Sequence, residues 1–306
     1  MKLCGALNLR KPAGPTSHDL VDAVRRLVPP RTKVGHAGTL DPMAEGVLPI
    51  CLGAATKLFP YLLDCRKTYR AVMRFGRVTD TLDVTGRTLA EKNPGEIAVE
   101  GVQRILDTFL GESEQVPPMF SALKVGGTRL HELARAGVEV ERKGRPIHVY
   151  AVRALEAEGP LLTFEVTCSR GTYIRVLCHD VGARQGSGGC LAALTRTALG
   201  PFRLEAARTL EEIRGLAGEG KLAEALMSPA QALGHLPALT VRPEAGERVR
   251  HGAALKPRDW AEGEVPPAEG RVRLLAPGGE LLAVGRMLPP RERARGWVAP
   301  DRVFAE

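Results

Sequence analysis

The sequence has few aromatic residues and no long apolar run. Aromatic residues make up 4% of the 306 residues, whereas hydrophobic residues reach 44%, which is ordinary for a globular protein. No apolar run approaches the roughly 20 residues that a transmembrane helix needs. Residues 1–8 also lack the long apolar stretch and the small-residue cleavage site of a signal peptide. We therefore expect a cytoplasmic protein.

Cysteine pairs are also missing. The chain has six cysteines, and none of them forms a C-x-x-C motif. Most lie inside apolar segments, which favours buried free thiols over metal ligation. A disulfide framework is not expected in a chain of this length without an export signal. The six are Cys4, Cys51, Cys65, Cys168, Cys178 and Cys190.

Basic residues exceed acidic ones. The 43 lysine and arginine residues outnumber the 35 acidic residues, which gives a net charge of +8 and a pI near 9.4. Ten of the basic residues are lysine, so 33 are arginine (43 − 10). The arginine guanidinium is a planar fork suited to phosphate and to stacking on bases. The excess favours a nucleic-acid partner, although a genome biased toward arginine would produce it as well.

The most informative stretch is GHAGTLDPMAEGVL at residues 35–48. Its glycines allow backbone angles that other residues avoid, and Asp41-Pro42 fixes a turn. The stretch therefore predicts a stiff loop that presents Asp41. Asp41 could be only a turn initiator, because Asp-Pro is a common turn dipeptide. The absence of G-x-G-x-x-G and of a Gly-Lys-Ser/Thr ending excludes a phosphate-binding loop.

The longer stretch GHAGTLDPMAEGVLPICLG resembles the signature of the TruB family of pseudouridine synthases. The aspartate of G-T-L-D-P is catalytic in that family, so the resemblance implies a catalytic role for Asp41. His36 is similar to the family histidine that fills the space left by flipped-out nucleotides. A turn histidine satisfied by backbone groups is the alternative for His36.

A second segment with this resemblance precedes the loop. Residues 7–9 read as a short strand, and a helix is predicted to start at Thr16, with Asp19 in a capping-box position, and to stop before Pro29. Lys11, between them, is either a solvated charge or a contact to RNA phosphate. The segment resembles the K-P-x-G-x-T-S element that supports the TruB active site, which implies a supporting, substrate-binding role for Lys11.

Residues 67–76 alternate between two faces, which predicts a strand. A tyrosine near a strand start is commonly packing alone. The K-T-Y of residues 67–69, however, resembles the K-x-Y motif whose tyrosine lies against the target base, so we include Tyr69 among the catalytic residues. Residues 79–86 read as a polar turn similar to the family's T-D-T-x-D-x-x-G, because a calcium loop would need more oxygen ligands.

The next segment resembles the element that TruB-type enzymes use to grip the tRNA elbow. Helical spacing predicts a helix around residues 102–109 with Gly111 as its C′ residue. The sequence QVPPMFSALKVGG at residues 115–127 and a short helix at residues 130–136 follow, and Lys124 is implied to bind substrate. The family commonly has tyrosine at two positions that differ here, Phe120 and His131.

A third match is CSRGTYIR at residues 168–175, at the end of a strand predicted for residues 162–169. In the family the final arginine, here Arg175, pairs with the catalytic aspartate. The resemblance therefore implies that Arg175 is catalytic and that Tyr173 binds substrate. A buried Asp–Arg pair also has a purely structural interpretation. A helix is predicted from residue 174 to about Gly186.

Residues 194–202, LTRTALGPF, are similar to the family's L-R-R-T-x-x-G-P-F. Leu194 corresponds to a leucine that packs on the uracil ring and binds substrate, although a leucine at helical spacing is commonly core. Thr195 replaces the first arginine of the motif, which weakens the case for a phosphate contact there.

The C-terminal part resembles the PUA-type β-barrel of bacterial TruB proteins. Residues 229–237 read as a linker, and residues 277–279 as a hairpin turn. Short strands are expected around Val241, Val249, 271–275, 281–284 and Val298. We therefore expect a catalytic domain at residues 1–232, with a tRNA-binding insertion at about 113–150, and a PUA-like RNA-binding domain at residues 237–306.

The resemblance implies an α+β pseudouridine synthase fold, in which a mixed, largely antiparallel sheet is flanked by helices. It implies an isomerase that converts the T-loop uridine at position 55 of tRNA to pseudouridine. The expected partner is the tRNA T-arm, with no metal, no cofactor and no obligatory protein partner, and the chain is expected to be a monomer. The alternatives are a guide-RNA-directed rRNA pseudouridine synthase subunit and a non-catalytic tRNA-binding chaperone.

The implied chemistry breaks an N–C glycosidic bond, turns the uracil and rejoins it through carbon. Asp41 would act either as nucleophile at the anomeric carbon or as base at the adjacent carbon. Arg175 would keep Asp41 aimed, and Tyr69 would stack on the base and accept the C5 proton. Flipping the uridine out of its RNA loop costs roughly a few kcal/mol.

Overall fold

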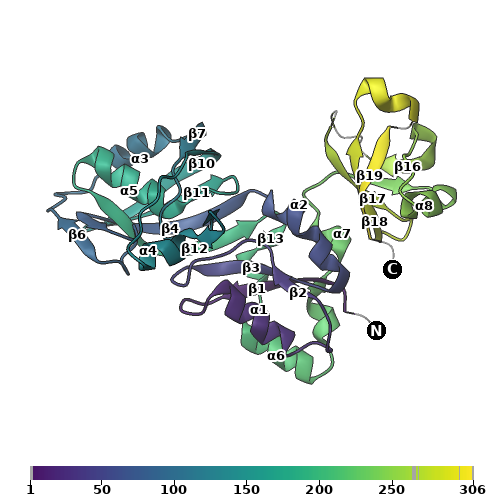
Figure 1. The fold of residues 1–306 in the computed structure, drawn as a ribbon, viewed down its shortest axis with the longest axis horizontal. Coiled ribbons are helices and arrows are strands. Elements are labelled where there is room, and N and C mark those ends of the chain that lie inside the picture. Colours follow the sequence, from purple (N-terminus) through teal and green to yellow (C-terminus); the bar gives the residue numbers. More distant parts are fainter. Residues whose placement is uncertain (1–2, 264–266, 268, 296, 305–306) are drawn as a thin grey trace. The chain divides into compact units, whose positions relative to one another are not determined.

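The computed structural model describes residues 3–263, 267, 269–295 and 297–304 and has the expected α+β architecture (Figure 1). Its residues form two compact units. The first comprises Met1–Pro42, Gly46–Cys65 and Leu199–Glu306, and the second comprises Met43–Glu45 and Arg66–Ala198. No helix in this described part of the chain has the length and apolar character that a membrane span requires.

In the first unit the strands β14, β1 and β3 pair antiparallel in that order, and β2 also pairs with β3. Strand β3 is the most buried, because alternate residues point to opposite faces and both faces are covered. Leu48 and Ile50 join one apolar cluster, and Val47 and Cys51 join another. The strands are β1 (Gly5–Lys11), β2 (Val34–His36), β3 (Glu45–Leu52) and β14 (Leu226–Met227).

Helices supply the other side of each cluster. The helix α1 (Ser17–Arg25) starts at the predicted capping box, in which Thr16 and Asp19 exchange side-chain and backbone hydrogen bonds. It packs with α6 (Leu210–Gly218) on the Leu48 side, whereas the Val47 side is covered by η1 (Gly53–Leu58), α2 (Phe59–Leu63) and α7 (Pro229–Ala232). The remaining short elements before the C-terminal sheet are β13 (Phe202–Arg203), η2 (Leu204–Ala206) and η3 (Leu222–Ala225).

The C-terminal part contains a five-stranded sheet with the order β16–β15–β17–β18–β19. Strands β15 and β17 are parallel and the other pairs are antiparallel. The predicted hairpin turn is confirmed, because Gly279 N donates to Ala276 O between β17 and β18. Among the described residues no pairing closes this sheet into a barrel. Its elements are β15 (Ala238–Val241), α8 (Pro243–Arg250), η4 (Pro257–Asp259), β16 (Trp260–Gly263), β17 (Arg271–Leu275), β18 (Leu281–Met287), η5 (Pro290–Arg295) and β19 (Val298–Val303).

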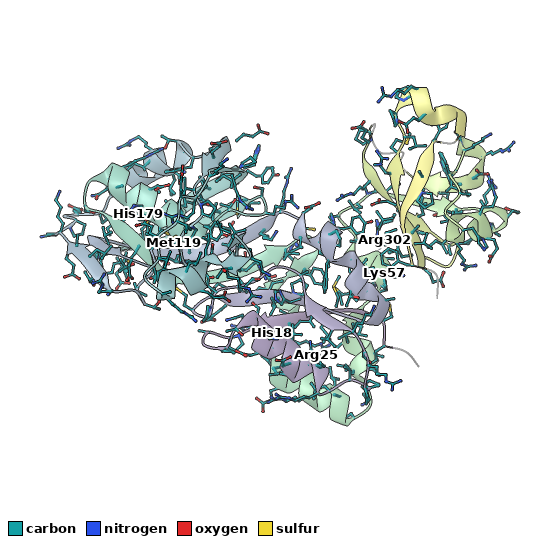
Figure 2. The ribbon with its side chains drawn as sticks, viewed as in Figure 1. His18, Arg25, Lys57, Met119, His179 and Arg302 are labelled. Atoms are coloured by element: carbon teal, nitrogen blue, oxygen red, sulfur yellow. The ribbon has the colours of Figure 1, made fainter. Side chains whose placement is uncertain are left out.

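This C-terminal sheet is bonded to η1 and α2, which belong to the same unit. The Tyr61 hydroxyl lies 2.9 Å from an Asp301 carboxylate oxygen, and the Arg271 guanidinium lies 2.9 Å from the Asp64 carboxylate. The Lys57 ammonium, labelled in Figure 2, donates to the Val303 carbonyl at 3.2 Å. These contacts place the C-terminal sheet in the first unit; the predicted domain boundary between residues 232 and 237 stays a prediction.

The second unit is built on the strand order β12–β4–β11–β10–β7. Strand β4 alternates as predicted, with Tyr69 and Phe75 among the buried residues and Arg70 and Arg74 exposed. The helices α3 and α5 pack on this part of the sheet. Its longer elements are β4 (Lys67–Phe75), α3 (Val99–Asp107), β7 (Gly111–Gln115), β10 (Arg145–Glu158), β11 (Leu161–Cys168), α5 (Ile174–Gln185) and β12 (Gly189–Leu199). Its short ones are β5 (Arg77–Thr79), β6 (Thr88–Glu91), β8 (Lys124–Val125), β9 (Thr128–Arg129) and α4 (Leu130–Arg135).

Four local predictions are wrong. The expected linker at residues 229–237 starts with α7, because Ser228 and a proline at the first turn form an N-terminal cap. Val249 lies in α8 rather than in a strand. Leu194 lies on the strand β12, so its helical spacing was misleading. The helix α3 is capped by Thr108, and Gly111 starts β7 instead.

Candidate active site

The loop that carries Asp41 lies in the first unit between β2 and β3. These strands pair antiparallel, with Val34 opposite Leu52 and His36 opposite Ile50, and Ala37 N extends the pairing by donating to Pro49 O at 2.9 Å. Gly38 then takes a φ of +94°, a conformation that side chains rarely adopt, so a glycine is required where the chain leaves the sheet. The predicted stiff loop is confirmed.

Backbone clamps hold both neighbours of Asp41. Leu40 N donates to the Ser17 hydroxyl at 2.9 Å, and that hydroxyl donates to Leu40 O at 3.1 Å. Pro42 O accepts from Gly14 N at 2.9 Å and from the Lys11 ammonium at 3.0 Å. Asp41 itself is half-buried. Its backbone is therefore fixed on either side by the start of α1 and by the loop after β1.

Lys11 is fully buried, with 0% of its surface exposed. Its ammonium donates to Pro12 O at 2.9 Å as well as to Pro42 O. A solvated loop charge is therefore excluded, since a buried ammonium is tolerated only where its charge finds polar partners. These bonds make Lys11 a brace of the loop, in line with the supporting role predicted for the segment. Its predicted contact with RNA phosphate stays a prediction.

Tyr69 lies on the buried face of β4 in the second unit, opposite Val166 of β11. Its side chain is hydrogen-bonded to Arg196 of β12, which is the neighbouring strand. Arg196 is 0% exposed, and burial lowers the pKa of its guanidinium while the bond to Tyr69 opposes that shift. Arg196 is thus a site residue that was not predicted, although it stands in the quoted LTRTALGPF motif.

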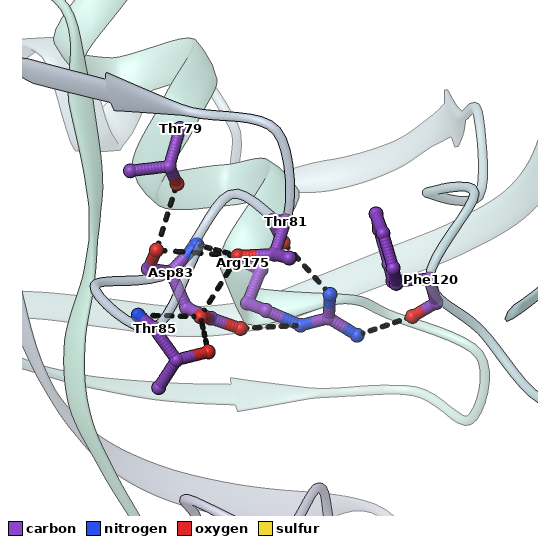
Figure 3. Close-up of polar contacts among 6 residues, drawn as sticks. All are labelled: Thr79, Thr81, Asp83, Thr85, Phe120 and Arg175. Atoms are coloured by element: carbon purple, nitrogen blue, oxygen red, sulfur yellow. Dashed lines mark hydrogen bonds and ion pairs between the residues drawn. The ribbon is translucent and has the colours of Figure 1, made fainter. Parts of the chain in front are cut away.

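Arg175 is the second residue of α5 and is only 4% exposed. Its two terminal nitrogens donate to Thr81 O at 2.9 Å and to Phe120 O at 2.8 Å (Figure 3). Its Nε lies 3.9 Å from Oδ2 of Asp83, as Figure 3 also shows. Two carbonyls and a buried carboxylate therefore fix the orientation of the Arg175 guanidinium.

Asp83, 6% exposed, is the second site residue that was not predicted. Its Oδ1 accepts from Thr81 Oγ1 at 2.9 Å, from Thr85 N at 3.0 Å and from Thr85 Oγ1 at 2.5 Å. These threonine bonds and the Arg175 contact support the polar-turn interpretation of residues 79–86. The T-D-T-L-D motif was the available signal, but the sequence does not show that this turn meets α5.

The turn around Asp83 is fixed to β12 and is strained. Leu191 N donates to Leu82 O at 3.0 Å, and Val84 N donates to Leu191 O at 2.9 Å, so Asp83 sits between two backbone bonds. Leu82 has a φ of +64°, which costs a non-glycine residue roughly 1–2 kcal/mol. Strain of this kind is stored where the surrounding structure holds a functional residue in place.

Tyr173 caps the N-terminus of α5, and the buried Gln115 holds its backbone. Tyr173 N donates to Gln115 Oε1 at 2.7 Å, and Gln115 Nε2 donates to Tyr173 O at 3.1 Å. Tyr173 itself is half-buried. Gln115 therefore ties the end of β7 to the loop from which Arg175 emerges.

The other predicted site residues lie as follows. His36 is half-buried at the end of β2, and Leu194 is buried on β12, two residues before Arg196. Lys124 is exposed on β8. Phe120 contributes its carbonyl to Arg175, Thr195 is half-buried, and the side chain of His131 lies outside the described part of the chain.

Each unit carries groups of the kinds that glycosidic chemistry on a nucleoside uses. The first unit supplies a carboxylate, Asp41, on a fixed loop; the second supplies Tyr69 on Arg196, and Arg175 on Asp83. Asp41 and Arg175 belong to different units, and their pairing stays a prediction. Within the second unit, Arg196 orients the phenol of Tyr69, and Asp83 orients the guanidinium of Arg175.

Solved structures with this fold define its class. The chain matches the "Structure of H/ACA RNP bound to a substrate RNA containing 2'-deoxyuridine" with a TM-score of 0.76 and 27% identity, over 99% of this chain and 85% of that one. It matches the "Crystal Structure of a Cbf5-Nop10-Gar1 Complex" with a TM-score of 0.76 and 29% identity, over 99% and 84%. The fold is that of a pseudouridine synthase.

Sequence comparison gives the family. The model described as "TruB family pseudouridylate synthase (N terminal domain)" matches residues 25–174. The chain is 45% identical over 276 residues to the tRNA pseudouridine synthase B of Geobacter sulfurreducens, covering 90% of both chains. It is 44% identical over 303 residues to that of Syntrophotalea carbinolica, covering 98% of this chain and 97% of the relative. The chain belongs to the TruB family of pseudouridylate synthases.

Proposed function

We propose that this protein isomerises uridine to pseudouridine in tRNA, at the T-loop position conventionally numbered 55. The observation that supports this most strongly is the end-to-end similarity to relatives named tRNA pseudouridine synthase B, which extends over both the Asp41 loop and the C-terminal sheet. The net charge of +8 suits a polyanionic substrate. The three predicted catalytic residues, Asp41, Tyr69 and Arg175, are all present.

In this proposal Asp41 is the group that acts on the ribose. Its backbone is held by Ser17 and Lys11 on either side, so the carboxylate is positioned before the RNA binds. Preorganisation of this kind avoids reorganisation during the reaction. Asp41 acts as nucleophile at the anomeric carbon or as base at the adjacent carbon, and both routes need it ionised.

Tyr69 and Arg175 act on the base and on Asp41. The Arg196 bond fixes the phenol of Tyr69, which stacks on the flipped uracil and accepts the C5 proton when the new C–C bond forms. The Arg175 guanidinium, oriented by Asp83, is the proposed partner that aims Asp41. His36 fills the space that the flipped nucleotide leaves, and Leu194 packs on the uracil. Tyr173 and Lys124 contact the RNA, whereas the fully buried Lys11 supports the Asp41 loop.

The proposed organisation has a catalytic domain at residues 1–232, with the insertion at about 113–150 against the tRNA elbow, and an RNA-binding PUA-like domain at residues 237–306. We further propose that the protein acts in the cytoplasm as a monomer on free tRNA, without a guide RNA or an obligatory protein partner.

Tritium release tests the reaction. A tRNA transcript labelled at C5 of uridine is incubated with wild-type protein, with Asp41→Asn and with Glu45→Gln, which removes the other carboxylate of the same loop. We expect release with wild type and Glu45→Gln, and tRNA binding without release for Asp41→Asn. Full turnover by Asp41→Asn would show that the site is wrong.

A second substrate tests the position and the partner. A transcript with cytidine in place of uridine 55 should release no tritium above background if T-loop specificity holds. Activity on the wild-type transcript without any added RNA or protein excludes a guide-dependent enzyme. Binding without release by the wild-type protein would instead indicate the tRNA chaperone.

A further inference from the structure

Two exposed side chains and a half-buried histidine form a stacked column on the second unit. The His148 and Tyr150 rings lie with centroids 4.2 Å apart and planes inclined by 24°. The Arg66 guanidinium carbon lies 3.9 Å from the centroid of the Tyr150 ring. Tyr150 is 38% exposed, and Arg66 is also exposed. We call these three residues the Tyr150 column.

A β-bulge lies at Tyr150, at one end of the column. In the pairing of β10 with β11, Val149 is opposite Cys168 and Ala151 is opposite Thr167, so Tyr150 is an extra residue between them. Before the bulge the odd-numbered residues Ile147 and Val149 are buried, and after it the even-numbered Ala154 is buried. Bulges of this kind redirect a side chain and are frequent next to functional sites. His148 and Tyr150 are two residues apart on the strand and therefore point outward on the same face, and the bulge changes the alternation only beyond Tyr150.

Regular hydrogen bonds hold the base of the column. His148 N donates to the Ser169 hydroxyl and Ser169 N donates to His148 O, both at 2.9 Å. Ser169 follows directly after β11, and Arg66 precedes β4, whose first residue Lys67 is opposite Cys168. The column therefore lies at the end of the sheet from which residues 170–173 lead into α5.

Stacking holds the plane of the Arg66 guanidinium against the Tyr150 ring and leaves the N–H groups at its edge accessible to a ligand. Within the described residues no hydrogen bond or ion pair engages this guanidinium, and Glu112 lies 3.9 Å from His148 with most of its surface in solvent. Arg70 is exposed on β4, and its guanidinium lies 3.5 Å from the Glu156 carboxylate. The surface therefore combines stacked planar side chains with a positive charge that the nearby carboxylates only partly balance.

Unpaired RNA has the matching chemistry. Single-stranded nucleic acid is bound by aromatic and guanidinium planes that stack on bases and by cations that contact phosphate. An acidic peptide would use the charge but would leave the planar stack without a counterpart. We propose that the Tyr150 column is an RNA contact, in which an exposed plane of the column stacks on an unpaired base and the Arg66 edge binds an adjacent phosphate. This inference rests on the proposed function, because it takes tRNA as the bound RNA.

Binding of full-length protein to tRNA at a series of salt concentrations tests the inference. Tyr150→Leu removes the ring, and Tyr150→Phe is its matched control because it keeps the stack and loses only the hydroxyl. We expect Tyr150→Leu to weaken binding by roughly 5- to 100-fold, as loss of one base stack does, and Tyr150→Phe to leave it unchanged. Thermal unfolding of each variant checks that the fold is retained.

Arg66→Gln removes the charge, and Arg74→Gln removes an exposed arginine farther along the outward side of the same strand. We expect Arg66→Gln to reduce the slope of log affinity against log salt by about one, whereas Arg74→Gln leaves it unchanged. Equal affinity and equal slope for wild type, Tyr150→Leu and Arg66→Gln would overturn the inference. So would a loss of affinity with Tyr150→Phe as large as with Tyr150→Leu.

The outcome is distinguishable from failure of the proposed function. Tritium release by the wild-type protein reports the reaction independently of the column. If wild type converts tRNA and Tyr150→Leu binds it normally, the reaction stands and the column is not an RNA contact. If Tyr150→Leu binds tRNA normally but abolishes capture of a protein partner, the surface serves a protein and the inference is wrong.

Discussion

Replacing Asp83 with asparagine is the sharpest test of the Arg175 cluster. Oδ1 of Asp83 accepts three hydrogen bonds, and Oδ2 faces Arg175 at 3.9 Å. Asparagine keeps the shape and an acceptor but loses the charge. Hydrogen bonds to a charged group contribute roughly 1.5–3 kcal/mol and neutral ones roughly 0.5–1.5 kcal/mol. Each of the three bonds is thus weakened by roughly 1–1.5 kcal/mol, which sets an expected loss of about 3–4 kcal/mol in the free energy of unfolding.

The same change should slow the reaction. Arg175 keeps its bonds to Thr81 O and Phe120 O, so it stays in place but loses the carboxylate that orients its Nε. Small displacements of a positioning group cost up to about 100-fold in rate. We expect single-turnover tritium release from tRNA to fall by about 10- to 100-fold, with tRNA affinity within about twofold of wild type.

Urea unfolding and single-turnover kinetics measure the two effects. Asp80→Asn is the control, because Asp80 lies in the same turn but its ion pair with the exposed Arg87 is 3.9 Å long and contributes at most about 1 kcal/mol. The reasoning is refuted if Asp83→Asn costs no more than Asp80→Asn. It is also refuted if Asp83→Asn is destabilised but turns over at the wild-type rate.

Three further changes test other parts of the structure. Lys11→Met should lower the free energy of unfolding by about 1–3 kcal/mol and slow tritium release, because two carbonyls lose their donor; a weaker, less salt-dependent tRNA affinity instead would show a phosphate contact. Gly38→Ala should cost at least about 1 kcal/mol in urea unfolding because its φ is +94°, whereas Gly215→Ala, on the exposed side of α6, should be neutral or stabilising. Burial and the Asp301 carboxylate raise the pKa of Tyr61 to about 12, above the usual value near 10. The stability that this group contributes is therefore present below pH 10 and is lost as the pH rises toward 12. In an absorbance titration of the four tyrosines, the ionisation step near pH 12 should be absent from Tyr61→Phe. If that step persisted, it would contradict the contact between Tyr61 and Asp301.

Local features of the fold followed from short-range chemistry. The capping box at Thr16, the alternation in residues 67–76 and the glycine end of α5 are each set by a few neighbouring residues, and each was predicted correctly. The Asp41 loop belongs with them, because Pro42 restricts the backbone and Gly38 allows a positive φ wherever the loop is placed. Motif resemblance extended these local predictions to a family.

Local patterns failed where the environment decided the outcome. Leu194 was assigned helical spacing, but β12 lies beside β4 in the sheet, and buried strands lack a period that distinguishes them from helices. The bulge at Tyr150 depends on the pairing of β10 with β11, which no single segment specifies.

The sequence alone indicated that an aspartate would stand on a tight loop, because proline fixes its own φ and glycine allows the positive φ that such a loop needs. Only the tertiary structure decided what surrounds the other site residues. Asp83, Gln115 and Arg196 meet Arg175, Tyr173 and Tyr69 across 92, 58 and 127 positions of sequence (175 − 83, 173 − 115 and 196 − 69). Hydrogen bonds and ion pairs act over a few ångström, so partners this far apart in the chain are chosen by the packing of strands and helices and not by local sequence.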